Sequence, residues 1–156
     1  MTPKKVLWIE DGIYSEMRKH ASPVRIELGY SLDIAESASE GLAKILTSEY
    51  DLVVVDIRLP PGEDHEWKAI QRKHLAGGGP ARLGLTLLQK LLGEDPIEKP
   101  AWVDASRFAV LTIETYNNIG PAVRDLGIRV CHHKERLSEP TALLRVVKEA
   151  LGEEES

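Results

Sequence analysis

The sequence predicts an α/β protein in which a five-stranded parallel sheet carries helices on both faces. Short apolar runs rich in β-branched residues, such as Leu52-Val53-Val54-Val55, alternate with longer stretches of helical spacing. The alternation repeats five times along 156 residues, with no internal sequence repeat. A strand–helix alternation of this kind favours parallel pairing, right-handed crossovers and a three-layer α/β/α arrangement.

The first half of the chain supplies three strands and two helices. Lys4 to Ile9 is predicted as the first strand and Ile13 to His20 as the first helix. After the turn at 29–30, Ser31 to Ala35 forms a short second strand. The next segment has apolar residues at helical spacing and is predicted to be a helix that starts at residue 37 or 38. Asp51 to Asp56 is the third strand, with no polar interruption before its end.

The second half repeats the pattern. A leucine-rich helix over 85–92 precedes a fourth strand, Arg107 to Thr112, and a short helix, Ile119 to Leu126, ended by Gly127. Ile128 to about His132 is the fifth strand. The last helix has Ser138 as its expected cap and Pro140 in its first turn, and its apolar stripe runs from Ala142 to Leu151. The acidic tail after it is expected to fray.

Two segments interrupt the simple alternation within what is predicted to be one domain, residues 1–156. Residues 60–83, with an amphipathic stretch and three consecutive glycines, are predicted to be an insertion between the third strand and the next helix. A second excursion covers 94–104. Connections in α/β units usually have ~2–6 residues, so the longer segment is functional or mobile. Trp67 and Trp102 in these segments either fix them to the core or form a partner surface.

Polar side chains stand at the ends of four predicted strands. Glu10 and Asp11 follow the first strand, Asp56 ends the third, Thr112 ends the fourth and Lys134 follows the fifth. Ligands of open α/β sheets gather outside the carboxyl ends of the strands. We therefore expect three carboxylates, a hydroxyl and an ammonium to share one crevice.

These residue types suit metal-assisted phosphoryl chemistry. Clustered carboxylates fit Mg²⁺, which prefers oxygen ligands and retains waters. The lysine and the hydroxyl would stabilise oxygens of a transferring phosphoryl group. The sequence has no glycine-rich Lys-Ser/Thr loop for nucleotide phosphates. The economical interpretation is that a carboxylate accepts the phosphoryl group as the nucleophile, and Asp56 is best placed for that role.

The motifs resemble those of the receiver domain of bacterial two-component response regulators. Glu10-Asp11 matches the acidic metal-binding pair, and Asp56 in Asp-Ile-Arg-Leu-Pro matches the phosphoacceptor. Thr112 matches the hydroxyl residue of the fourth strand, and Lys134 follows Gly127 by the interval seen in the family. Gly84 opens a stretch similar to the family's Gly-x-x-Leu-Leu. Each motif alone is weak, but five in order at strand ends are specific.

The resemblance implies a flavodoxin-like (CheY-like) fold with strand order 2-1-3-4-5. It also implies that a histidine kinase or phosphotransfer protein phosphorylates Asp56. Mg²⁺ would be held by Glu10, Asp11, Asp56 and the backbone carbonyl of Arg58. Such a domain is not a classical enzyme, because it assists only its own phosphorylation and dephosphorylation. Phosphorylation would bias a two-state surface that a separate output protein reads.

Some positions depart from the family pattern. Ile113 stands where a small residue usually follows the hydroxyl, Cys131 replaces the usual switch aromatic, and Glu135 replaces the usual proline after the lysine. These departures favour an alternative function, a receiver-like interaction module that does not switch by phosphorylation. A Mg²⁺-dependent phosphohydrolase is a third hypothesis, ranked last because Arg58 stands where a second acid/base aspartate would be expected.

Composition sets the remaining bounds. A formal net charge of −5 argues against nucleic acid as the main partner. The single cysteine, Cys131, excludes an intramolecular disulfide and suits a reducing compartment. No apolar stretch approaches the ~20 residues of a membrane span, so we expect a soluble cytoplasmic protein. Little sequence follows Leu151, so output would reside on another chain, or this chain is a fragment of a longer one.

Overall fold

The computed structural model of the chain describes residues 3–12, 14–133 and 141–152. Within these residues the elements are, in order, β1 (Lys5–Ile9), α1 (Tyr14–Glu27), β2 (Ser31–Ala35), α2 (Ala38–Thr47), β3 (Leu52–Val55), α3 (His65–Ala76), α4 (Leu83–Leu92), the 3-10 turn η1 (Ala105–Arg107), β4 (Phe108–Thr112), α5 (Tyr116–Asp125), β5 (Val130–His133) and α6 (Ala142–Ala150).

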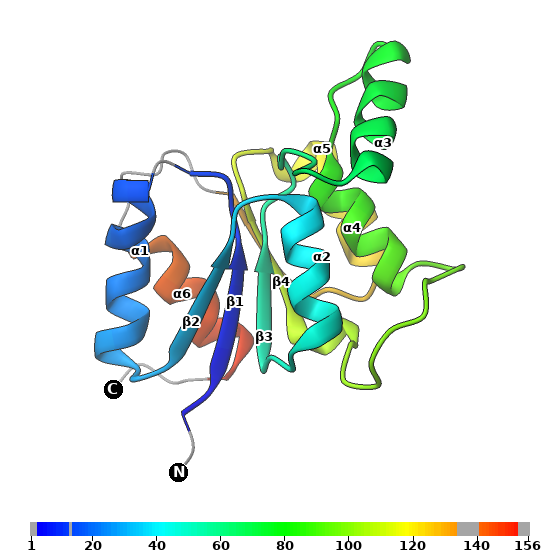
Figure 1. Cartoon of the computed structure of the whole chain (residues 1–156). Coiled ribbons are helices and arrows are strands. Elements are labelled where there is room, and N and C mark those ends of the chain that lie inside the picture. The colour runs from blue at the N-terminus through cyan, green and yellow to red at the C-terminus, as the bar shows by residue number, and fades with distance from the viewer. Residues whose placement is uncertain (1–2, 13, 134–140, 153–156) are drawn as a thin grey trace.

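The strands form one parallel sheet in the order β2-β1-β3-β4-β5. Helices α1 and α6 cover one face, and α2, α4 and α5 cover the other (Figure 1). The predicted fold class and strand order are confirmed.

Side-chain alternation along the strands divides the core into two layers. Leu7, Val53 and Val110 pack toward α2, α4 and α5, whereas Trp8 and Val54 pack toward α1 and α6. Each of these side chains is fully buried. Burial of one such side chain stabilises the fold by about 1.5–3 kcal/mol. Because the central strands are apolar on both faces, they hold the polar residues that follow them at fixed positions.

Several predicted boundaries were wrong. The first helix does not end at His20 but continues to Glu27, with Pro23 inside it. Buried Ala21 and Val24, one helical turn apart, pack against the core and outweigh the proline's cost. The helix predicted over 119–126 starts earlier, at Tyr116. The prediction began too late because the first turn of this helix is polar and gives no apolar signal.

Two further boundary errors concern the last two strands. Arg107, predicted as strand, lies in η1. The fifth strand begins at Val130 rather than Ile128, because the register pairs Val130 with Ala109. Residue 128 would therefore lie level with Arg107, which is not in a strand. Ser138, Pro140 and the acidic tail after residue 152 lie outside the described residues.

Residues 60–83 contain α3, which lies beyond the end of the sheet toward which the strand arrows point (Figure 1). Asp64 caps this helix by accepting hydrogen bonds from the backbone N–H groups of Glu66 and Trp67. Trp67 is only 3% exposed and belongs to the core layer on the α4 side. The tryptophan therefore fixes the base of α3 to the domain.

Trp102 has the same role in the second excursion. Its ring meets that of Tyr50 edge to face at a centroid distance of 6.1 Å. The guanidinium of Arg107 lies 5.8 Å from the Trp102 ring centroid and donates a hydrogen bond to the Tyr50 carbonyl. Of the two roles open from sequence, both tryptophans have the structural one.

Candidate functional site

The candidate site begins with two carboxylates that follow the central strands β1 and β3. Ile9 pairs with Val55, so Glu10 and Asp56 are level with each other at the carboxyl edge of the sheet. The Asp56 N–H donates to the Ile9 carbonyl at 3.0 Å, and the Glu10 N–H donates to the Ala35 carbonyl at 2.9 Å. Both acids are buried, at 2% exposure for Glu10 and 4% for Asp56. Two adjacent strands thus hold two carboxylates away from bulk water.

Thr112 adds a hydroxyl to the two carboxylates. It is the last residue of β4 and is fully buried. Because Val55 pairs with Val110, Thr112 lies at the same edge as Asp56, one strand away. Its Oγ1 accepts the Glu114 N–H at 3.2 Å. Lys134 lies outside the described residues, but its predecessor His133 pairs with Thr112 across β4 and β5.

Asp11 and Arg58 flank the two buried acids. The Asp11 side chain is exposed. The Arg58 N–H donates to Asp56 Oδ1 at 3.3 Å, which closes the turn after β3. Among the described residues, no three His, Cys, Asp or Glu side chains gather as a metal-binding group.

The donor set nevertheless has the chemistry that Mg²⁺ requires. Magnesium usually takes one or two protein carboxylates, and waters or phosphate oxygens fill its remaining positions. Glu10 and Asp56 supply two buried carboxylates at one edge, and exposed Asp11 is adjacent for a contact through water. The ligand set of Glu10, Asp11, Asp56 and the Arg58 carbonyl remains a prediction.

The structure adds one acidic residue that the sequence did not single out. Glu114 is 6% exposed and lies in the loop between β4 and α5. Its carboxylate accepts hydrogen bonds from Arg58 Nε and, at 3.2 Å, from Arg82 Nε. The His133 ring contacts the Glu114 carbonyl oxygen, with Nδ1 at 3.1 Å. We call Arg58, Arg82 and Glu114 the rim cluster.

The rim cluster is held together by charge. Burial by itself raises the pKa of the Glu114 carboxyl, but hydrogen bonds from Arg58 and Arg82 outweigh that effect and keep the pKa below its ordinary value. Glu114 is 56 residues from Arg58 and 32 from Arg82. No local sequence signal predicts pairing over such separations.

Gly84 places α4 directly against the turn that carries Asp56. Its N–H donates to the Ile57 carbonyl at 2.9 Å. A Cβ at this position would lie 1.9 Å from the Asp56 carbonyl oxygen. Only glycine permits this approach, which gives the glycine noted in the sequence a physical role.

The atypical switch positions differ in their surroundings. Ile113 is 52% exposed at the rim of the site, next to buried Thr112. Cys131 is half-buried beside the core layer on the α4 side, and burial raises the pKa of its thiol. Glu135 lies outside the described residues.

Comparison with known proteins identifies the fold. The structure resembles a CheY-like response regulator receiver domain protein from Methanospirillum hungatei, with a TM-score of 0.65 and 23% identity over 97% of this chain and 96% of that one. A two-component response regulator from Clostridium difficile gives a TM-score of 0.64 and 20% identity over 98% of this chain and 99% of that one. The chain therefore has the CheY-like receiver fold.

Sequence comparison gives a partial match. The chain is 36% identical over 84 residues to the probable transcriptional regulatory protein SilR of Salmonella typhimurium. The match covers 54% of this chain and 35% of that protein, so the chain spans only about a third of its relative. No family model matches the sequence. In the described part of the chain, no helix is long and apolar enough to cross a membrane.

Proposed function

We propose that this chain is the receiver of a two-component phosphorelay and accepts one phosphoryl group on Asp56, with Mg²⁺ as cofactor. The observation that carries the proposal is the pair of buried carboxylates, Glu10 and Asp56, at the carboxyl ends of adjacent central strands in a receiver fold. A strand-end pair of this kind suits a site that binds a divalent cation.

The proposed reaction is a transfer from a phosphohistidine of a kinase or phosphotransfer protein. A carboxylate oxygen of Asp56 forms a new bond to phosphorus as the phosphorus–nitrogen bond of the donor breaks. The imidazole nitrogen leaves with the bonding electron pair and takes up a proton. Glu10, Asp11, Asp56 and the Arg58 carbonyl would hold Mg²⁺, which neutralises negative charge on the transferring group. Lys134 is assigned the same electrostatic role by resemblance.

Thr112 is suited to bind the transferred group. A hydroxyl can accept and donate hydrogen bonds at the same time. Thr112 Oγ1 accepts from the Glu114 N–H, so its own hydrogen is available to a phosphoryl oxygen. The same contact links Thr112 to the residue at the centre of the rim cluster. A phosphoryl group bound by Thr112 would therefore shift the loop of Glu114, whose carboxylate binds Arg58 and Arg82. A separate output protein would bind the surface that this shift changes.

The alternative function is an interaction module that binds its partner whether or not Asp56 is modified. Half-buried Cys131 at the usual switch position favours this alternative. A cysteine has no ring, so it cannot rotate between two positions as a switch aromatic does. The two functions differ in one observable. The module binds its partner equally before and after treatment with a phosphodonor, whereas the receiver does not.

The experiment is incubation with acetyl phosphate, with and without Mg²⁺, read by intact mass. We expect one added phosphoryl group that requires Mg²⁺ and disappears in Asp56→Asn. Asp95→Asn, an equal change at an exposed loop position, is the matched control and should be modified like the wild type. Circular dichroism verifies that both variants fold. Equal uptake by Asp56→Asn, or none by the folded wild type, would refute the proposal. Multiple turnover of a small phosphate ester would instead indicate the phosphohydrolase.

A further inference from the structure

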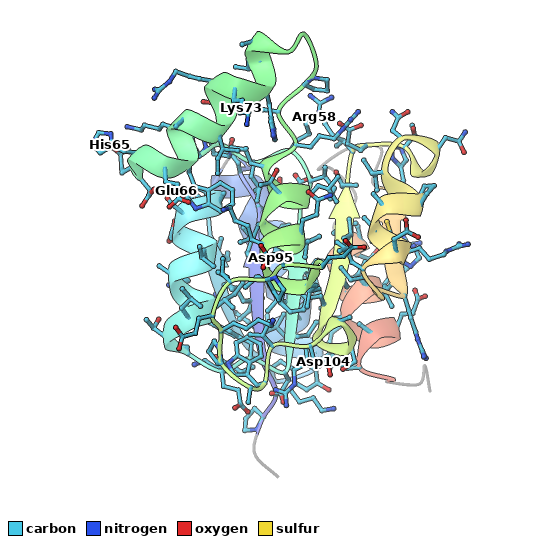
Figure 2. All side chains as sticks on the ribbon, turned by 90° about the vertical axis from the view of Figure 1, so that its right-hand side faces the viewer. Arg58, His65, Glu66, Lys73, Asp95 and Asp104 are labelled. Atoms are coloured by element: carbon cyan, nitrogen blue, oxygen red, sulfur yellow. The ribbon has the colours of Figure 1, made fainter. Side chains whose placement is uncertain are left out.

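Helix α3 is fixed to the domain through residues of its first half. The Trp67 ring is buried against the core, and the Lys90 ammonium of α4 lies 5.7 Å from its centroid. Lys90 also lies 3.6 Å from the Glu66 carboxylate. Figure 2 shows α3 above α4, with His65 and Glu66 at the end near α2 and Lys73 in the half that extends away from it. The helix is thus anchored through its first half, and its second half extends beyond that anchor.

The outer half presents positive charge and one apolar side chain. Arg72 and Lys73 are exposed, and within the described part of the chain no ion pair involves either of them. Leu75 beside them is 55% exposed. The helix has three Lys and Arg residues against one Glu, although the whole chain has a net charge of −5. This surface is therefore complementary to an acidic face with an apolar contact.

Both ends of the inserted segment are tied to the phosphoacceptor site. On the entry side, Arg58 contacts Asp56 through its backbone and Glu114 through its side chain. On the exit side, Arg82 contacts Glu114, and Gly84 bonds to Ile57. Because α3 lies beyond the carboxyl edge of the sheet (Figure 1), it stands on the same side of the domain as Asp56, where a macromolecular donor would contact it.

On the premise that Asp56 is the phosphoacceptor, we propose that Arg72, Lys73 and Leu75 of α3 form a docking surface for the phosphodonor protein. The donor's contact face carries carboxylates that meet Arg72 and Lys73, and an apolar patch that covers Leu75. Charges at the rim of an interface mainly raise the association rate, and salt screens their effect. The helix would thus select the donor, while the residues at the strand ends perform the transfer.

The test is phosphotransfer from the histidine kinases of the source genome, each autophosphorylated with labelled ATP. The fastest donor is then measured against Arg72→Glu/Lys73→Glu. We expect the transfer rate to fall by about tenfold or more at low salt, and the wild-type rate to fall more steeply with salt than that of the variant. Lys99→Glu/Arg129→Glu makes the same charge change elsewhere and should stay within about twofold of the wild type. Leu75→Ala should slow transfer without changing its salt dependence.

Uptake from acetyl phosphate separates this proposal from the one on which it rests. A small donor needs no docking surface, so Arg72→Glu/Lys73→Glu should take up a phosphoryl group from it at the wild-type rate. Equal kinase transfer to the variant and to the wild type would overturn the docking surface and leave the receiver function intact. Uptake from acetyl phosphate with no transfer from any kinase would likewise overturn the docking surface. Failure of uptake by the wild type would refute the receiver function itself.

Discussion

Replacement of Gly84 by alanine tests how closely α4 must approach the phosphoacceptor turn. The added Cβ would lie 1.9 Å from the Asp56 carbonyl oxygen, whereas ordinary contact starts at 3.4 Å. Helix α4 must therefore withdraw by about 1.5 Å, the difference between those distances. The neighbouring atoms are backbone, so no side-chain rotation relieves the overlap. The 2.9 Å hydrogen bond from Gly84 to Ile57 would be lost.

The magnitude follows from three contributions. Overpacking costs about 1–3 kcal/mol, and the lost hydrogen bond costs about 1 kcal/mol. Alanine recovers about 1 kcal/mol of helix propensity relative to glycine. The free energy of unfolding should therefore decrease by about 2 kcal/mol. For a domain of this size, the melting temperature should fall by roughly 4–8 °C.

The assay is thermal unfolding by circular dichroism, together with phosphoryl uptake from acetyl phosphate. Gly79→Ala is the matched control, because a Cβ added at Gly79 would have no atom within 4 Å and the φ of this residue is not left-handed. That variant should unfold within about 0.5 kcal/mol of the wild type. Uptake by Gly84→Ala should slow, because the turn that holds Asp56 loses its hydrogen bond to α4. An unchanged or raised melting temperature would refute the close approach of α4.

Two further predictions concern the anchor of α3 and the rim cluster. Trp67→Ala removes the buried ring that fixes α3; loss of such a ring costs about 3–5 kcal/mol in a core, so amide exchange over 65–76 should accelerate while β1 and β3 stay protected. Leu75→Ala, at an exposed position of the same helix, should leave exchange unchanged, and equal protection in both variants would contradict the anchor. Glu114→Gln should lower stability by about 1–2 kcal/mol near pH 7, a value reduced because the Arg58 and Arg82 side chains are 46% and 30% exposed. Since the folded pKa of Glu114 is lowered, its contribution is present above the ordinary glutamate pKa of about 4.3 and is lost as the pH falls through the lowered value. The stability difference between wild type and variant should therefore shrink in acid, and a difference constant down to about pH 3 would exclude the charge-based explanation.

The sequence predicts the sheet well because its signal is local. Leu52 to Val55 are apolar on both faces, which is typical of a strand buried in a parallel sheet, and Asp56 follows at once. Strand order came from the resemblance rather than from periodicity. Helix ends were less accurate: packing of Ala21 and Val24 carries α1 past Pro23, and local propensity cannot anticipate that tertiary contact.

In the candidate site, too, some residues could be predicted from the sequence and others could not. Glu10, Asp56 and Thr112 could be found from sequence because each directly follows or ends an apolar run. Glu114 could not, because its importance depends on two arginines brought to it by distant loops. The role of Trp67 was open for a similar reason: an amphipathic stretch does not reveal whether its aromatic residue faces the core or a partner.

The most direct test of the receiver function is to locate the phosphoryl group on the chain. After treatment with acetyl phosphate and Mg²⁺, borohydride reduces an acyl phosphate to an alcohol, so a phosphorylated aspartate becomes homoserine and is located by peptide mass spectrometry. We expect homoserine at position 56 and at no other aspartate. A reduced residue at Asp11, or phosphate on a serine, threonine or histidine with Asp56 unmodified, would contradict the proposed function.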